Sequence, residues 1–328
     1  MARYPFAICV VSYNGAGDLP GCLASIAAQT LSDIQVVIVD NASQDNSAEI
    51  AREMCPAAVR IVLPKNLGFT GGFNAAIRAT DAEYVLVLNQ DARLESDFCA
   101  RAVSFLGQHP EVGSVNARVL RTSQDSLTKT TTEPTIDTCG LVIFKNHLVK
   151  NLGEDQPVSQ YANSTELWGV CAAVAVYRKA ALDDVAEMRD GVAQYFDEDF
   201  FMYQEDVDLA YRLKWRGWTA WYLADAVAYH SRTRKGGASR SNQQINYWSY
   251  RNHWYLLIKN ASFGVILRCF PQVIFVEFAK FFYRGLWERG WFREFGEIGK
   301  NLSIMRVKRA EIMSCRKISD REMIRYFS

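Results

Sequence analysis

Carboxylates gather among aromatic side chains between residues 196 and 208, where the sequence reads Phe-Asp-Glu-Asp-Phe-Phe-Met-Tyr-Gln-Glu-Asp-Val-Asp. The apolar spacing that follows predicts a packed helix beginning near Glu205. A helix dipole stabilises the charged form of a carboxylate in the first turn. Asp206, beside Glu205 and aromatic walls, is therefore a candidate general base for a hydroxyl group. The alternative is an acidic helix start whose carboxylates only cap the helix.

A second carboxylate stands where a divalent cation could be held. Asn89, Gln90 and Asp91 follow the most apolar strand-length run, Tyr84–Leu88. An acidic side chain at such a strand end can bind Mg²⁺ or Mn²⁺ with help from a diphosphate, or it can simply cap a turn or helix. His230 ends another strand-like run. Its neutral imidazole is a candidate third metal ligand, and the alternative is a buried structural histidine.

Four expected strands are each followed by hydrogen-bonding residues. Because ligands of open α/β sheets bind at the carboxyl ends of the strands, polar groups at four such ends predict one polar ligand site. The residues of this site would be Ser12, Tyr13 and Asn14 after the first strand, Asp40 and Asn41 after the second, Asn66, Gly68, Gly71, Gly72 and Asn74 after the third, and Asn89 and Gln90 after the fourth.

Two of these strand ends have more specific chemistry, and each has a simpler alternative. The Asp40 carboxylate could accept hydrogen bonds from a ribose or a base N–H, or it could cap a helix that begins near Ser43. The glycine-rich turn over residues 66–74 would let the backbone approach a ligand at a helix N-terminus, where negative charge is favoured. A plain tight loop is the alternative interpretation of that turn.

Two further segments are assigned to ligands. The loop Ser231–Ser239 has paired glycines and three cations, which suits contact with a diphosphate and equally suits a solvated basic loop. The cations are Arg232, Arg234 and Lys235. Trp168 and Gly169 stand at the start of a strand-like run and are candidates for a second ligand.

The elements that must position these residues alternate strand and helix over the first 120 residues. The strand runs are rich in Val and Ile and apolar on both faces, as parallel strands covered by helices must be. They are Ala7–Ser12, Ile34–Asp40, Val59–Leu63 and Tyr84–Asn89, and the helical candidates are Leu19–Gln29, Ser43–Met54, Gly72–Thr80 and Asp97–Gln108. This order predicts an open, doubly wound α/β sheet.

The pattern changes after residue 120. The polar stretch Arg121–Pro134 indicates a loop. The later runs are the strand-like Ile136–Phe144 and Trp168–Tyr177, the segment Tyr195–Arg216 that turns helical at its end, the strand-like Trp218–Tyr229, and a helical, aromatic pattern from Asn242 onward. We divide the chain into a first domain of residues 1–240, with parts at 1–120 and 121–240, and a helical region of residues 241–328.

Composition narrows the class of protein. The 328 residues are 49% hydrophobic and 22% charged, which is ordinary for a globular chain. The eight cysteines form no CxxC pair, which favours buried thiols in a reducing cytosol. No apolar run is long enough for a membrane span or a signal peptide, so we expect a cytoplasmic protein.

Charge is unevenly distributed along the chain. Residues 251–328 have 15 Lys and Arg against 7 Asp and Glu, although the whole chain has a formal net charge of +1. Such a basic tail could bind anionic lipid, a phosphorylated acceptor or another protein, whereas nucleic acid is not expected because no nucleic-acid motif is recognised.

The pattern of residues 263–288 predicts an amphipathic helix that Pro271 breaks or kinks. Its apolar face could lie on the inner surface of the membrane, on the first domain or on a second subunit of a homo-oligomer.

Five segments, in this order, resemble glycosyltransferase family 2 and specifically its bacterial rhamnosyltransferase-like branch. They are Val11–Gly15, Val39–Ser47, Asn66–Asn74, Leu88–Asp91 and Phe200–Leu209, and together they span roughly two thirds of the chain. The resemblance implies a GT-A fold, in which helices flank a mainly parallel, Rossmann-like sheet. Here a C-terminal helical extension would follow it.

The resemblance also implies an activity, which is the inverting, metal-dependent transfer of a sugar from a nucleotide diphosphate donor to an acceptor hydroxyl. The strand-end residues named above would bind the donor, with Asp40 on its nucleotide, and Trp168 and Gly169 would contact the acceptor. Of the catalytic pair Glu205 and Asp206, Asp206 would be the base. Asp91 and His230 would hold the Mg²⁺ or Mn²⁺ ion. The family's metal motif usually has two acidic residues, or Asn-Pro-Asp in this branch, whereas residues 89–91 here read Asn-Gln-Asp. With one carboxylate, the metal would depend more on the diphosphate and on His230.

The implied partners are a donor such as deoxythymidine-diphosphate (dTDP) rhamnose or a UDP-sugar, and a glycan or polyprenyl-linked acceptor in bacterial cell-surface polysaccharide synthesis. Two other functions stay open. The glycine run over residues 15–21, with Asp40 downstream, is close to a dinucleotide fingerprint and would suit a nicotinamide-dependent oxidoreductase. Asn89 in place of an acidic residue would suit a catalytically silent protein that binds nucleotide sugars.

Overall fold

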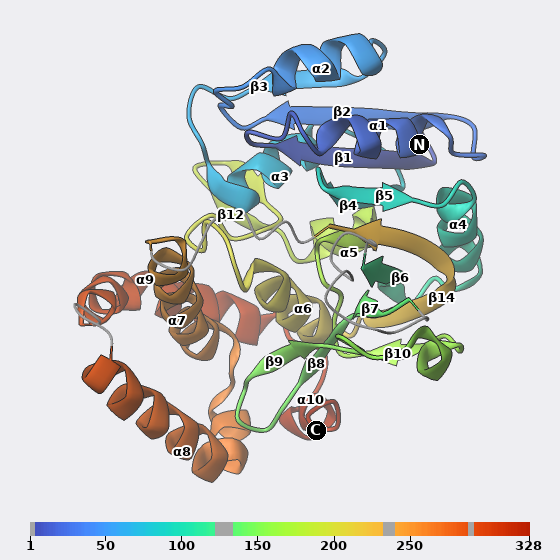
Figure 1. Ribbon diagram of the computed structural model, residues 1–328. Helices are drawn as coiled ribbons and strands as arrows, with labels where there is room; N and C mark the ends of the chain where they lie inside the picture. Colours follow the sequence, from blue (N-terminus) through green and yellow to red (C-terminus); the bar gives the residue numbers. More distant parts are fainter. Residues whose placement is uncertain (1–3, 122–133, 232–239, 288–291) are drawn as a thin grey trace.

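A mixed ten-stranded sheet forms the centre of the molecule (Figure 1), and the computed structural model describes residues 4–121, 134–231, 240–287 and 292–328. The strands of this sheet are β1 (Phe6–Ser12), β2 (Ile34–Asp40), β3 (Val59–Val62), β4 (Tyr84–Asn89), β5 (Ala92–Leu94), β6 (Val112–Arg121), β7 (Ile136–Thr138), β10 (Thr165–Leu167), β11 (Val174–Arg178) and β14 (Thr219–His230). Two small hairpins lie outside it, formed by β8 (Leu141–Ile143) with β9 (Val149–Asn151) and by β12 (Glu187–Arg189) with β13 (Val192–Gln194).

The helices cover both faces of the sheet and continue beyond it. Those of the first 230 residues are α1 (Leu19–Ala27), α2 (Ser47–Met54), α3 (Gly68–Arg78), α4 (Phe98–Gln108), α5 (Lys179–Asp184) and α6 (Glu205–Trp215), with a short 3₁₀ turn at Val158–Tyr161. The C-terminal helices are α7 (Arg240–Asn260), α8 (Phe263–Trp287), α9 (Arg293–Ser314) and α10 (Asp320–Ile324). Figure 1 shows α7, α8 and α9 grouped at one side of the molecule, away from β1–β3.

The order of strands along the sheet is β10-β14-β6-β11-β4-β1-β2-β3. The β3-β2-β1-β4 half is wholly parallel, as the strand–helix alternation predicted. The strand β11 then pairs antiparallel with both β4 and β6, while β14 runs parallel to β6. The prediction of a mainly parallel α/β sheet flanked by helices, followed by a C-terminal helical extension, is therefore confirmed.

Alternate residues of each strand supply the two cores. Ile8 and Val10 of β1 face a core closed by α1, α2 and α4, whereas Cys9 faces a core closed by α3, α5 and α6. Because both faces are buried, the strands must be apolar at every position, and this is why the sequence shows continuous Val and Ile runs without alternation. A third core joins α6 to α7, α9 and the chain end, which ties the C-terminal helices to the sheet domain.

Two element boundaries differ from the prediction for identifiable reasons. The third helix begins at Gly68 rather than Gly72, because the side chain of Asn66 accepts a hydrogen bond from the Gly68 N–H at 2.8 Å and so makes the glycine turn its first turn. Of the predicted break or kink at Pro271, the break does not occur, because α8 continues through this residue, and the kink stays a prediction. The carbonyl that the proline leaves unpaired belongs to Leu267, which is exposed, so this group need not be buried without a partner.

Candidate functional site

The carboxyl ends of three strands meet along one rim of the sheet. In the parallel register, Ser12 of β1 lies beside Asp40 of β2, and Val11 lies beside Asn89 of β4. Hydrogen bonds then join the loops. The backbone N–H of Tyr13 donates to Gln90 Oε1 at 2.9 Å, and the Gln90 amide donates back to the Tyr13 carbonyl at 3.3 Å. The predicted donor residues of these three strands are therefore neighbours.

The loop after β1 is also joined to the loop after β2. The backbone N–H of Asn14 donates to Ser43 Oγ at 3.0 Å, and the side-chain oxygen of Asn14 accepts from the Gln44 N–H at 2.8 Å. Asn14 itself adopts a left-handed backbone with φ of 50°, a conformation that asparagine tolerates better than most residues. The loop after β1 is thus fixed in place before any ligand binds.

Asp40 and Ser12 present unpaired oxygen atoms at this rim. Asp40 is buried, and its Oδ2 accepts a hydrogen bond from the Ser43 N–H at 3.2 Å. Its Oδ1 and the Oγ of Ser12 are buried without a hydrogen-bond partner. The helix α2 starts only at Ser47, so Asp40 caps a turn and not that helix. Buried polar atoms are almost always paired, and a bound ligand would supply the missing partners.

The glycine-rich turn shapes the same rim by close packing. A Cβ on Gly68, whose φ is +71°, would lie 2.3 Å from the carbonyl oxygen of Phe201, and a Cβ on Gly72 would lie 2.7 Å from Val11. The amide of Asn41 fixes the turn by donating to Gly68 O at 2.9 Å. The same amide donates to Asn66 Oδ1 and accepts from the N–H of Leu67. The glycines therefore allow β1 and the acidic segment, residues 196–208, to approach α3.

Asn74 lies on α3 and faces the protein interior. Its side-chain oxygen accepts hydrogen bonds from the N–H groups of Tyr195 and Phe196, both at 2.9 Å. Its NH₂ group donates to Phe196 O at 2.7 Å and to Glu198 Oε1 at 3.0 Å. All four hydrogen-bonding positions of this buried amide are occupied, so in this structure Asn74 positions the acidic segment. Direct contact of Asn74 with the donor stays a prediction.

The predicted metal ligands meet each other. The Nε2 atom of His230 lies 3.2 Å from Asp91 Oδ1, because β14 pairs with β5 and brings His230 opposite Ala92. The other ring nitrogen, Nδ1, lies 2.9 Å from the buried carboxylate of Asp137. Burial alone would lower the pKa of His230, but its hydrogen bonds to Asp137 and Asp91 raise it to about 9.

Asp137 is a residue that sequence reasoning missed. It lies in β7, is fully buried, and holds the His230 ring with Nε2 directed at Asp91. Carboxylates commonly orient metal-binding histidines in this way, through the ring nitrogen that does not bind the metal. The signal in the sequence was an aspartate inside the strand-like run Ile136–Phe144, but nothing local indicated that its partner lies 93 residues later.

Asp206 lies beside the end of β4. Its Oδ2 accepts a hydrogen bond from the Ala172 N–H at 3.3 Å, and the next residue, Ala173, accepts a hydrogen bond from the Asn89 N–H at 3.0 Å. These two consecutive residues just before β11 therefore connect the predicted base to the strand end that carries Asp91. Burial raises the pKa of Asp206 even though two backbone N–H groups stabilise its charged form.

Glu205, the first residue of α6, is more strongly perturbed than Asp206. It is buried, and its Oε2 has no hydrogen-bond partner. Burial and the adjacent Asp206 carboxylate raise the pKa of Glu205 well above its usual range. Two neighbouring acids with raised pKa values titrate as a pair, so one of them can stay protonated while the other is the base.

The loop before α6 is strained and held from the C-terminal region. Phe201, Tyr203 and Gln204 all have left-handed backbones, with φ of 64°, 67° and 69°. Such conformations persist only where surrounding contacts enforce them. The amide of Asn252, on α7, donates to the carbonyls of Phe200, Met202 and Tyr203 at 3.0, 2.9 and 2.7 Å. Sequence reasoning missed Asn252, because its partners lie about 50 residues earlier.

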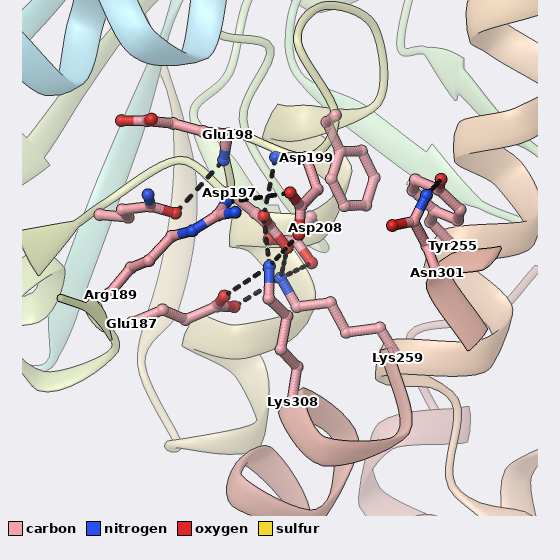
Figure 2. A network of polar contacts seen from close by, with 12 residues as sticks. Glu187, Arg189, Asp197, Glu198, Asp199, Asp208, Tyr255, Lys259, Asn301 and Lys308 are labelled. Carbon is pink, nitrogen blue, oxygen red and sulfur yellow. Dashed lines mark hydrogen bonds and ion pairs between the residues drawn. The ribbon is translucent and has the colours of Figure 1, made fainter. Parts of the chain in front are cut away.

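A cluster of acids and lysines lies behind this loop, as Figure 2 shows. The carboxylates of Glu187, Asp197 and Asp208 lie close enough together to suit a metal ion. However, the Nζ atom of Lys259 lies 2.6 Å from Asp197 and 2.8 Å from Asp208, and the Nζ atom of Lys308 lies 2.6 Å from Asp197. The lysine ammonium groups already neutralise this cluster, so we interpret it as the ionic connection between α6, α7 and α9.

The remaining predicted site residues lie elsewhere. Trp168 is only 4% exposed and packs edge-on against Tyr211, and a Cβ on Gly169 would lie 2.5 Å from Ala210, so both residues lie in the core. Both also line a small cavity of about 10 Å³ together with Asp206, and their assignment to the acceptor stays a prediction. Arg232, Arg234 and Lys235 lie outside the described residues, as does most of the expected loop Arg121–Pro134.

Comparison with known proteins identifies the family to which this chain is similar. Residues 7–185 match the family model described as Glycosyl transferase family 2. A PGL/p-HBAD biosynthesis glycosyltransferase of Mycobacterium bovis is 34% identical over 113 residues, which cover 33% of this chain and 44% of that relative. This chain therefore matches less than half the length of that relative.

Two more distant likenesses cover most of the chain. The N-acetylglucosaminyl-diphospho-decaprenol L-rhamnosyltransferase of Mycobacterium tuberculosis is 24% identical over 254 residues, or 70% of this chain and 77% of that protein. The structure of the mannosyltransferase PcManGT from Pyrobaculum calidifontis, in complex with GDP-Man and Mn²⁺, superposes with a TM-score of 0.55 at 17% identity, over 95% of this chain and 86% of that one. This last likeness shows a shared GT-A-like fold.

Proposed function

Because this chain belongs to glycosyl transferase family 2, we propose that it is an inverting enzyme that moves a sugar from a nucleotide diphosphate donor to an acceptor hydroxyl. The observation that carries this proposal is the position of Asp206 beside the end of β4, the strand end from which Asp91 reaches His230. A partly buried base and a pair of cation ligands at one rim suit a single displacement between two bound substrates.

The donor nucleotide would occupy the rim formed by β1 and β2. The unpaired oxygens of Asp40 and Ser12 would accept or exchange hydrogen bonds with the base or ribose. The first-strand loop, fixed by Gln90 and Ser43, would supply the wall beside them. This placement uses the same strand ends at which open α/β sheets bind ligands.

Asp91 and His230 would hold a divalent cation. Their oxygen and nitrogen atoms lie 3.2 Å apart, and Asp137 fixes the ring, so one carboxylate and one oriented imidazole would bind an Mn²⁺ or Mg²⁺ ion. Because the raised pKa keeps His230 protonated without a metal, the cation would displace the proton on Nε2. Diphosphate oxygens would complete the ligand set, as the single carboxylate requires. A cation bound there stabilises the negative charge that develops on the diphosphate leaving group.

Asp206 would remove the proton of the acceptor. As the acceptor oxygen forms its bond to the anomeric carbon, the bond from that carbon to the diphosphate breaks, and the hydroxyl proton moves to the Asp206 carboxylate. The raised pKa brings the base closer to neutral pH, which makes proton transfer more favourable than with an ordinary aspartate. Such general base catalysis is worth roughly 10²–10⁴-fold in rate.

The identities of donor and acceptor rest on names of similar proteins. The distant mycobacterial relative is named as a rhamnosyltransferase that acts on a diphospho-decaprenol-linked sugar, which supports dTDP-rhamnose as donor and a polyprenyl-linked acceptor. The fold neighbour holds GDP-Man and Mn²⁺, so other nucleotide sugars, UDP-sugars included, belong in any screen. We place the reaction in bacterial cell-surface polysaccharide synthesis.

The C-terminal helices would bring the enzyme to the inner membrane surface. The described residues include no helix with the length and apolar character to cross a bilayer. The helix α8 nevertheless exposes a row of large apolar side chains: Phe263, Leu267, Phe270, Ile274, Phe275, Phe278, Phe282 and Leu286. Residues 251–328 are also strongly basic. A broad apolar face on a basic segment suits the interface of an anionic bilayer.

A donor screen tests the proposed function. Purified protein with Mn²⁺ would be incubated with a panel of nucleotide diphosphate sugars and NAD, and products would be read by mass spectrometry. We expect one nucleotide sugar to be consumed, and its consumption to stop when EDTA removes the metal. Binding of a nucleotide diphosphate without any turnover would support the silent binding protein instead, and turnover of NAD would support an oxidoreductase.

A further inference from the structure

A small cavity of about 10 Å³ lies between α6 and the sheet, and Asp206 is part of its wall. This volume is about the lower limit for one water molecule and far below that of a small-molecule site. Other parts of the wall are Trp168 and Gly169 before β11, Tyr177 of β11 and Ser114 of β6, all of them buried. The cavity is therefore an internal space at the predicted base and not a substrate pocket.

Two side chains in the cavity wall have polar groups that no protein atom satisfies. Trp168 is 4% exposed and Tyr177 is 1% exposed, and neither the Trp168 Nε1 nor the Tyr177 hydroxyl has a hydrogen-bond partner. An indole N–H can only donate, and a buried donor left unpaired is costly. Burial and the nearby Asp206 carboxylate raise the pKa of Tyr177 well above its usual range, so its hydroxyl keeps its proton and can donate as well.

One water molecule would satisfy the polar groups of this wall together. Buried waters typically make about three hydrogen bonds to groups that would otherwise be unpaired. A water that accepts from the Trp168 N–H and the Tyr177 hydroxyl has its own two hydrogens left to donate. An ionised carboxylate only accepts hydrogen bonds, so Asp206 is the matching partner in the wall. The three side chains therefore fix the direction of the water, which donates to the base.

The charged form of Asp206 depends on hydrogen bonds and not on the cation in the cavity wall. That cation is Lys214, but its Nζ atom lies 3.4 Å from Oε1 of Glu166, with which it pairs. The Asp206 carboxylate accepts instead from the backbone N–H groups of Ala172 and Val207, at 3.3 and 2.8 Å. A water held in the cavity would be a third donor, which stabilises the carboxylate without adding a charge.

We propose that Trp168 and Tyr177 are positioning residues that hold one buried water against the Asp206 carboxylate. This inference rests on the proposed function, in which Asp206 is the base. The segment that leads into β11 would then hold the base twice, directly through the Ala172 N–H and through the water bound by Trp168. Trp168 would thus act on the base and not on the acceptor, which agrees with its burial.

Removing the two donors tests the inference. Trp168→Phe and Tyr177→Phe each keep an aromatic ring but remove the N–H or the O–H, and the double variant removes both. Trp215→Phe and Tyr222→Phe are the matched controls, because these buried side chains make their hydrogen bonds outside the cavity wall. In full-length protein labelled with ¹³C at the aspartate carboxyl groups, NMR would follow the titration of Asp206, whose signal D206N identifies.

We expect the titration midpoint of Asp206 to be about one pH unit higher in the double variant than in wild type, because the lost hydrogen bond stabilised the charged carboxylate. The two control variants should leave the midpoint unchanged. Glu205 is present in every sample, so its coupling to Asp206 is common to all of them. In transfer assays, the acid side of the pH profile should move by the same amount while the donor Kd stays the same. An unchanged midpoint in a folded double variant would overturn the inference.

A high-resolution crystal structure of the wild-type protein gives a second readout that does not depend on whether the variants fold. We expect one water peak within hydrogen-bonding distance of Trp168 Nε1, the Tyr177 hydroxyl and the Asp206 carboxylate. A cavity with no water peak, or one filled by a side chain, would overturn the inference. Neither readout requires transfer, so a protein that holds this water but uses no nucleotide sugar would refute the proposed function alone.

Discussion

At the scale of single residues, the site combines the buried Glu205 with the partly exposed Asp206, and the two acids differ in what surrounds them. Asp206 accepts two backbone hydrogen bonds, whereas Glu205 has an oxygen with no hydrogen-bond partner, and burial raises the pKa of both. A buried acid without a cation is costly to ionise, so the protein keeps these groups at the expense of stability. That cost is expected where a base must be close to neutral pH.

Replacing Asp206 should remove catalysis without removing donor binding. We expect Asp206→Asn to lower the transfer rate by roughly 10²–10⁴-fold while the donor Kd measured by calorimetry is unchanged. The pH dependence of wild-type transfer activity is a second test of this role. Because only the deprotonated base acts and its pKa is raised, activity should fall with decreasing pH well before the pKa near 3.9 of an ordinary aspartate is reached. Near wild-type turnover of D206N would contradict the assignment.

Glu205→Gln should stabilise the fold in a pH-dependent way. A carboxyl group whose pKa is raised in the folded state favours folding at low pH, and this contribution is lost as the pH rises through the folded pKa. The difference in unfolding free energy between E205Q and wild type, measured in urea, should therefore shift in favour of E205Q as the pH rises from about 4 to 8. Glu53→Gln, at an exposed position, is the matched control and should show no such trend. A pH-independent difference for E205Q would contradict the burial argument.

At the scale of elements, a C-terminal helix holds the loop that presents the base. Hydrogen bonds from Asn252 to three carbonyls fix a loop with three left-handed residues, and Arg251 adds bonds to the carbonyls of Asp199 and Phe200 at 2.7 and 3.1 Å. Without these bonds the loop could relax to more favourable backbone angles and move Glu205 and Asp206. The helix α7 is therefore part of the catalytic unit.

Asn252→Ala should separate this positioning role from general stability. We expect a loss of about 1–3 kcal/mol in unfolding free energy and a fall of about tenfold or more in transfer rate. Asn301→Ala on α9, which loses hydrogen bonds from Asn301 to Tyr255 and Glu297, is the control and should lose stability but not activity. Equal effects of N252A and N301A on the rate per folded molecule would argue against a positioning role.

The sequence predicted the elements better than the contacts between them. The parallel strands were visible because burial on both faces leaves uninterrupted Val and Ile runs, and Asp91 and His230 stood out because each ends such a run. Asp137 and Asn252 did not stand out, because each is defined by partners about 50 to 93 residues away. The amphipathic helix at 263–288 was evident, but the packing of α7 and α9 against α6 was not.

At the scale of the whole molecule, the C-terminal helices have two different faces. One face is fixed to the sheet domain by the third core and by Lys259 and Lys308, which neutralise Asp197 and its neighbours. The other face, on α8, is open and apolar. The sequence left three positions open for the apolar face of residues 263–288, and Val265 and Cys269 near the start of α8 are buried in the third core with α7 and α9. The exposed face of α8 is free for a bilayer.

Charging the open face of α8 should release the protein from membranes. Phe275 and Leu286 are 75% and 76% exposed, so replacing both with Asp should leave the fold intact. In flotation with anionic liposomes, we expect wild-type protein to float and the double variant to stay in solution. Val62→Asp, at a 68% exposed position on the edge strand β3, is the control and should float like wild type. Wild-type protein that stays wholly in solution would contradict the membrane proposal.

The position of the metal tests the central claim most directly, because the structure offers two clusters of acidic ligands. Crystals grown with Mn²⁺ and a nucleoside diphosphate would be measured for anomalous scattering. Our account predicts a manganese peak bound to Asp91 and His230, on the same rim as Asp206. A peak between Glu187, Asp197 and Asp208, where Lys259 now lies, or no peak beside Asp91, would contradict it.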